Sequence, residues 1–169
     1  NRRPPLPRAA ARRVPRRRRR LIVHRSNPRV AEDLAAVDVL IHQHMASPVG
    51  VIPNLAAHLI DAGGKRIRPL LVLMANDAFG GDVKQALNPA FAMEVFHNFT
   101  LVHDDIMDQA PLRRGKHTVH KEFGMPRAIL SGDVMLIYVY EYFKHLPDAQ
   151  FRQVMDVFNK AAIEVCEGQ

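Results

Sequence analysis

The stretch NPAFAMEVFHNFTLVHDDIMDQAPLRRG, residues 88–115, joins a long apolar segment to three aspartates and two arginines. Asn88 suits a helix N-cap and Pro89 suits the first turn, so a helix is expected to begin there. Asp104 and Asp108 stand four residues apart, which places both carboxylates on one face of that helix, about 6 Å from each other. Two interpretations follow: a site for Mg²⁺, or an acidic helix end lying on the surface.

Two arginines follow the aspartates on a segment that is expected to be a loop, residues 109–118. Arg113 and Arg114 can bind phosphate oxygens bidentately, and arginine together with a metal ion is a common clamp for a diphosphate. His97 precedes Asp104 by two helical turns and shares its stripe. A histidine in this position is by itself more often a core or surface residue than a ligand.

A second basic segment is GGKRIRP, residues 63–69. Its glycines end one helix, and Lys65, Arg66 and Arg68 crowd the start of the next. Cations there are unfavourable unless an anion binds among them, and free backbone N–H groups at a helix start attract anions. The alternative is a solvated basic turn. One bare cationic site and one metal-dependent site would together suit two phosphorylated substrates.

Helical periodicity is the dominant pattern after residue 28. No segment alternates convincingly with a period of two, so the expected fold is an all-α bundle. The segment from Pro126 to Leu146 is apolar nearly all round, and burial on every side is expected for it. Helices are expected within the stretches 29–45, 52–64, 68–81, 88–108, 126–146 and 148–168.

Composition limits the cellular setting. The chain of 169 residues suits one domain, and its single cysteine, Cys166, excludes an intramolecular disulfide and fits a reducing compartment, so a cytoplasmic location is expected. The longest apolar runs, such as MLIYVY at residues 135–140, fall far short of the roughly 20 residues that a membrane span needs. A secretory signal is not recognisable either.

The net charge of +7 belongs to the N-terminal tail. Residues 1–29 hold 12 arginines and no acid, so the remaining residues hold 12 basic and 17 acidic side chains, a net charge of −5. Residues 1–28 are rich in arginine and proline and are predicted to be a disordered tail, with the folded domain over 29–169. The tail could be an arm for nucleic acid or anionic lipid, an organellar transit peptide, or a segment without function.

These motifs carry a family resemblance. GGKRIRP, LVHDDIMD, the RRG that follows and EVCEGQ at the end resemble the trans-isoprenyl diphosphate synthase (polyprenyl synthetase) family, over residues 30–169. The resemblance implies an isoprenoid-synthase-type helical bundle. It also implies condensation of an allylic diphosphate with isopentenyl diphosphate, with Mg²⁺ assisting ionisation of the allylic substrate, and a homodimer of the complete enzyme. Neither a nucleic-acid partner nor a membrane span is implied.

Roles are implied for individual residues by the same resemblance. Asp104 and Asp108 match the metal ligands, Asp105 has a supporting role, and Arg113 matches the contact to the allylic diphosphate. Residues Lys65, Arg68, His97 and Arg114 match the isopentenyl diphosphate site. Phe99, with Thr100 beside it, matches the positions that limit product length, and an aromatic residue there resembles members with short-chain (C15–C20) products. The stretch MASPVGVIPNLAAHLIDAGGKRIRPLL, residues 45–71, looks more like bacterial long-chain synthases, so the two regions favour different product lengths.

The chain also departs from the family pattern. The second aspartate-rich motif of the family is absent before Gln169, and His117 stands where the family usually has proline. The chain is therefore interpreted as the N-terminal half of such an enzyme, inactive and poorly soluble alone. The alternatives are a non-catalytic synthase-like subunit that acts through assembly, a nucleic-acid binder that uses the arginine tail, and a di-metal carboxylate bundle. The intact aspartate motif argues against the first, and the absence of Glu-x-x-His pairs in residues 30–169 argues against the last.

Overall fold

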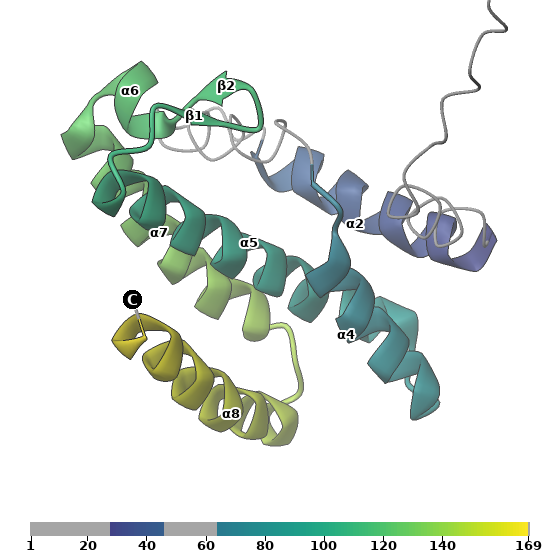
Figure 1. The fold of residues 1–169 in the computed structure, drawn as a ribbon. Coiled ribbons are helices and arrows are strands. Elements are labelled where there is room, and N and C mark those ends of the chain that lie inside the picture. Colours follow the sequence, from purple (N-terminus) through teal and green to yellow (C-terminus); the bar gives the residue numbers. More distant parts are fainter. Residues whose placement is uncertain (1–27, 46–63, 169) are drawn as a thin grey trace, which may run out of the picture. The chain divides into compact units, whose positions relative to one another are not determined.

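The structure is a computed structural model that describes residues 28–45 and 64–168 (Figure 1). The chain divides into two compact units, Asn1–Glu32 and Asp33–Gln169. The described part of the first unit is the start of one helix, Pro28–Glu32. Most of the tail predicted over residues 1–28, and the helix predicted within 52–64, lie outside the described residues.

The described residues form six helices and one short hairpin, which confirms the all-α prediction. The hairpin is antiparallel and pairs Leu112 with His117 and Arg113 with Lys116. In chain order the elements are α2 (Pro28–Met45), α4 (Ile67–Ala78), α5 (Val83–Met107), β1 (Leu112–Arg113), β2 (Lys116–His117), α6 (Val119–Phe123), α7 (Met125–Phe143) and α8 (Asp148–Glu167).

Helix α5 is the centre of the core, with α4 and α7 packed against it (Figure 1). Its 25 residues correspond to about 37 Å of helix. Its buried side chains point in several directions instead of forming one apolar stripe, as expected for a helix that is surrounded by others. They are Ala86, Ala90, Phe91, Ala92, Glu94, Val95, Phe96, Asn98, Phe99, Val102 and Asp105.

The prediction that α5 begins at Pro89 was wrong, because the helix begins at Val83. Asp82 is the N-cap, and its carboxylate accepts a hydrogen bond of 3.0 Å from the backbone N–H of Lys84. Pro89 is therefore inside the helix, where it removes one backbone donor. Ala86 and Ala90 are buried on either side of it, and we attribute the continuation of the helix to this packing.

The prediction that α7 is buried on every side was also wrong. Its buried residues Ala128, Ser131, Met135 and Val139 follow helical spacing and form one stripe, whereas Ile137 is 60% exposed. Small residues in the stripe let α7 approach α5 closely, so the helix is held by one face and presents apolar side chains on the other. None of the helices in the described ranges is long and apolar enough to cross a membrane.

The hairpin replaces the loop that was predicted for residues 109–118. Arg114 and Gly115 form its two-residue turn, and both have positive φ, 53° and 83°. This backbone is the one that tight hairpin turns require, and glycine adopts it without steric cost. The hairpin therefore places the two arginines beside each other at the edge of the bundle. Arg113 is the last residue of β1, and Arg114 is the first residue of the turn.

Candidate functional site

The C-terminal end of α5 carries the three aspartates of the motif, named here the acidic end (Asp104, Asp105 and Asp108). Asp104 lies in the last turn, and Asp108 is the C-cap, with its backbone N–H donating to the carbonyl of Asp104 at 2.8 Å. The predicted four-residue spacing on one helix is thus present. Asp105 differs from the other two because it is only 2% exposed.

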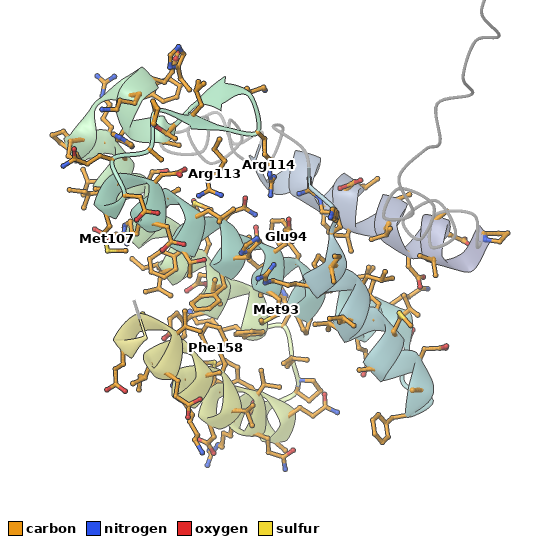
Figure 2. All side chains as sticks on the ribbon, viewed as in Figure 1. Met93, Glu94, Met107, Arg113, Arg114 and Phe158 are labelled. Atoms are coloured by element: carbon orange, nitrogen blue, oxygen red, sulfur yellow. The ribbon has the colours of Figure 1, made fainter. Side chains whose placement is uncertain are left out.

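Asp105 is paired with the hairpin. The Nε of Arg113 donates to Oδ2 of Asp105 at 2.7 Å, and in Figure 2 the side chains of Arg113 and Arg114 extend from the hairpin toward α5. The hydrogen bond to Asp105 raises the pKa of Arg113, and it also fixes the position of the charged guanidinium group. Asp105 therefore positions an arginine, and Asp104 and Asp108 are the two carboxylates of the motif that were predicted to bind a cation.

Electrostatics at the acidic end favour a bound cation. Burial raises the pKa of Asp104, and the carboxylates of Asp108 and Asp105 raise it further, while Arg113 acts in the opposite direction. Within residues 28–45 and 64–168, no cluster of three or more His, Cys, Asp or Glu side chains is close enough to hold a metal ion. Two carboxylates fit Mg²⁺, which usually completes its shell with water and with phosphate oxygens of the substrate.

A second site, the basic pocket, brings together all four residues that were assigned to isopentenyl diphosphate. They come from three segments: the start of α4, the middle of α5 and the turn of the hairpin. The cavity measures about 270 Å³. Its lining consists of Gly64, Lys65, Arg66, Ile67, Arg68, Glu94, His97 and Arg114.

His97 lies between the cationic side chains of this pocket and is half-buried. Burial lowers its pKa, and the positive charge of Arg68 lowers it further, as do Arg114 and Arg113. Glu94 acts in the opposite direction. The neutral ring is therefore favoured, and it can donate one hydrogen bond to an anion without adding positive charge.

Sequence reasoning missed an ion pair among the residues that line the basic pocket. Nη1 of Arg66 donates to Oε1 of Glu94 at 2.8 Å, and Nε of Arg66 donates to Oδ1 of Asp38 at 3.0 Å. Arg66 had been grouped with the neighbouring cations. A signal was available in the helix register, because Glu94 precedes His97 by one turn and so shares its face.

Two apolar cavities meet at Phe99. The smaller cavity, about 210 Å³, is lined by Phe99, Thr100 and Asp104 among others. The larger cavity, about 550 Å³, is lined by Phe96 and Phe99 and by residues of α7 and α8. Phe99 and Cys166 line both cavities. Thr100 lines the smaller cavity, and its hydroxyl donates to the carbonyl of His97 at 2.8 Å.

A helical bundle with a basic pocket and a paired-carboxylate helix end defines the class of isoprenoid synthases, and solved structures of that class share the fold. The polyprenyl synthetase family matches residues 50–169. The chain belongs to this family, which confirms the assignment made from its motifs.

Several relatives are named as geranylgeranyl diphosphate synthases. The chain is 45% identical over 117 residues to a geranylgeranyl pyrophosphate synthase of Geoglobus acetivorans, a match that covers 68% of this chain and 36% of the relative. It is 38% identical over 142 residues to the geranylgeranyl diphosphate synthase of Sulfolobus acidocaldarius, with coverage of 82% and 43%. The crystal structure of the geranylgeranyl pyrophosphate synthetase from Pyrococcus horikoshii superposes with a TM-score of 0.79 at 38% identity, with coverage of 90% and 46%. The chain thus spans less than half the length of these relatives.

Proposed function

We propose that the chain carries the first half of a magnesium-dependent trans-prenyltransferase, which joins an allylic diphosphate to isopentenyl diphosphate. The observation that carries this proposal is the convergence of Lys65, Arg68, His97 and Arg114 on one cavity. Two matched relatives are geranylgeranyl diphosphate synthases, which supports a short-chain product. A cytoplasmic location and a homodimeric assembly remain predictions from the sequence.

The basic pocket suits the diphosphate that stays intact during the reaction. Lys65, Arg68 and Arg114 supply positive charge without a metal ion, and His97 supplies a neutral hydrogen bond. Interactions of this kind hold and orient a substrate, and they withdraw little charge from the bond to carbon. Isopentenyl diphosphate needs no more, because its reacting group is the double bond at the other end of the molecule.

The acidic end suits the diphosphate that leaves. Asp104 and Asp108 would hold Mg²⁺, which when bound stabilises negative charge that develops on the departing diphosphate. Arg113, fixed by Asp105, contributes a further positive charge beside these carboxylates. The allylic C–O bond breaks and its electron pair leaves with the diphosphate. The isopentenyl double bond then forms the new C–C bond, and the loss of a proton restores an alkene.

The smaller cavity suits the hydrocarbon tail of the allylic substrate. It begins at Asp104, as the tail of a metal-bound diphosphate would, and it ends at Phe99, five residues earlier on α5. Phe99 also lines the larger cavity, so its ring would limit the length of a tail that extends from the smaller cavity into the larger one. We therefore assign product-length control to Phe99, with Thr100 forming the wall beside it.

The magnesium dependence of allylic binding tests this function. Geranyl diphosphate is titrated into the purified 169-residue chain, with Mg²⁺ or with EDTA, and the heat of binding is measured. Mg²⁺ is expected to strengthen binding at least about tenfold, because a cation held by Asp104 and Asp108 would supply positive charge for the diphosphate. The gain is expected to disappear in Asp104→Asn/Asp108→Asn and to persist in Asp156→Asn, a control on the exposed side of α8.

Two results would contradict the proposal. One is binding of geranyl diphosphate that does not respond to Mg²⁺ in the unaltered chain. The other is an equal response in Asp104→Asn/Asp108→Asn. We also expect no sustained condensation of labelled isopentenyl diphosphate by this chain alone, because the second aspartate-rich motif of the family is not part of it; steady turnover would refute that expectation.

A further inference from the structure

An acidic side chain lies in the wall of the basic pocket. Glu94 is 3% exposed and lines the cavity together with Arg68, His97 and Arg114. A carboxylate in this position repels phosphate, because the interaction of two like charges is strong at short range and low dielectric. The pocket can therefore bind a diphosphate well only if the charge of Glu94 is compensated.

Arg66 supplies the compensation. It is 9% exposed, and its guanidinium binds Glu94 at 2.8 Å and Asp38 at 3.0 Å. Its backbone is in the left-handed region, with φ at 49°, which is unfavourable for a residue with a side chain. The two carboxylates hold the guanidinium, and the unusual backbone is accepted where this side chain turns into the protein.

The space around Gly64 shows how closely Arg66 approaches a cation of the pocket. A methyl group added at Gly64 would lie 3.1 Å from Nη1 of Arg66 and 3.2 Å from Nη1 of Arg114. Glycine thus leaves room for two guanidinium groups at the same edge of the cavity. One of them is paired with Glu94, and the other belongs to the predicted diphosphate contacts.

We propose that Arg66 is a positioning residue of the basic pocket, which pairs with Glu94 and so leaves the charges of Lys65, Arg68 and Arg114 to the diphosphate. The inference rests on the proposed function, because it specifies how the same pocket selects a phosphorylated ligand. Four cationic side chains and one carboxylate line the cavity, and three positive charges remain after the pair is formed. Removal of Arg66 would leave two.

Arg66 could instead touch the anion directly, or it could serve the fold alone. The double substitution Arg66→Met/Glu94→Met separates these roles. It removes both charges of the pair, leaves no buried carboxylate without its arginine, and keeps the net charge of the pocket at its original value. Methionine also resembles both side chains in length.

The test is the binding of inorganic pyrophosphate to the 169-residue chain in EDTA, where the metal-dependent site does not contribute. Arg66→Met is expected to weaken binding at least about tenfold. Arg66→Met/Glu94→Met is expected to bind within about threefold of the unaltered chain, whereas Arg68→Met, which removes a predicted contact to the anion, stays weak. The slope of affinity against salt concentration is expected to fall in Arg66→Met and to recover in the double variant.

Each outcome has a defined meaning. A double variant as weak as Arg68→Met overturns the proposal, since Arg66 would then touch the anion. Undiminished binding by Arg66→Met overturns it too, as does weaker binding with an unchanged salt slope, which marks a role in folding alone. If Arg66→Met does not fold, the comparison of the double variant with Arg68→Met decides. Failure of the unaltered chain to bind pyrophosphate would overturn the proposed function together with this inference.

Discussion

Helix α5 carries two buried acids, Glu94 and Asp105, and the comparison of their surroundings is instructive. They are 11 residues apart, which is three helical turns, so they lie on the same face of the helix. Each accepts a hydrogen bond from an arginine of a different segment, Arg66 before α4 and Arg113 on the hairpin. The same arrangement thus attaches two separate basic segments to one helix.

The two neighbourhoods nevertheless have opposite charge. Around Glu94 the remaining charged side chains are cationic, and around Asp105 they include the carboxylates of Asp104 and Asp108. In both places the opposite charges of the buried ion pair cancel. The charged side chains outside the pair therefore set the sign of the site. In a motif with three aspartates, the middle one pairs with an arginine, and the outer two are the carboxylates proposed to bind the cation.

The largest difference between the two pairs is expected in stability. Arg66→Met leaves Glu94 buried without its strongest partner and is expected to cost about 3–5 kcal/mol of unfolding free energy. Arg113→Met is expected to cost less, about 1–3 kcal/mol, because Arg113 is 28% exposed and its removal admits water to Asp105. Urea unfolding followed by circular dichroism measures both.

Arg152→Met on the exposed side of α8 is the control for this measurement, with an expected change within about 0.5 kcal/mol. An equal loss of unfolding free energy in Arg66→Met and Arg113→Met would contradict this prediction, because it would show that the solvent exposure of the arginine does not determine the strength of the pair.

The second difference is that, among the residues that the structure describes, only the acidic end adjoins an apolar cavity. Asp104 lines the smaller cavity, whereas no residue of the basic pocket does. Phe99→Ala is expected to widen the connection between the two apolar cavities and to strengthen Mg²⁺-dependent binding of geranylgeranyl diphosphate at least about fivefold relative to geranyl diphosphate. Calorimetric titration of both ligands measures this preference. Pyrophosphate binding in EDTA is expected to stay unchanged.

Phe96→Ala is the matched control. Phe96 is buried to nearly the same degree as Phe99, but it lines only the larger of the two cavities. Both substitutions remove a buried aromatic ring, at a similar cost in stability of about 3–5 kcal/mol. An unchanged preference in Phe99→Ala, or the same change in Phe96→Ala, would argue against Phe99 as the residue that limits chain length.

The smallest expected effect is a pH dependence that comes from the basic pocket. The pKa of His97 is lowered in the folded chain from its ordinary value of 6.5, chiefly by burial. As the pH falls through about 6.5, the unfolded chain therefore takes up a proton before the folded chain does, and stability declines. Urea unfolding at a series of pH values should show a shallower decline for His97→Gln, and an identical decline in both proteins would contradict this assignment.

Much of this arrangement was predictable from the sequence. Helical periodicity and proline–glycine punctuation gave the fold class and the positions of α4, α7 and α8. Charge spacing indicated Asp104 and Asp108, and the family motifs supplied the four residues of the basic pocket, which the structure brings to one cavity. These features depend on neighbours along the chain or on recognisable short motifs.

The unpredicted features depend on packing between distant segments. Arg66 and Glu94 are 28 residues apart, and a sequence does not show which of several similar cations reaches a buried acid. The start of α5 was misplaced because burial of Ala86 and Ala90 outweighed the proline between them. The hairpin was missed although Arg114-Gly115 has the glycine that a tight turn favours.

Helix α8 has one buried side chain, Phe158, which is labelled in Figure 2. Its ring packs against the rings of Phe96, Tyr140 and Phe143. The same helix supplies the outer wall of both apolar cavities. Its other core contacts come from side chains that are only partly buried, namely Phe151, Val154, Met155 and Ala162. A helix held mainly by partly buried side chains opens at lower free energy than the core, so the wall of both cavities is expected to open more readily than α5. Backbone amides of α8 should accordingly exchange with solvent well before those in the middle of α5.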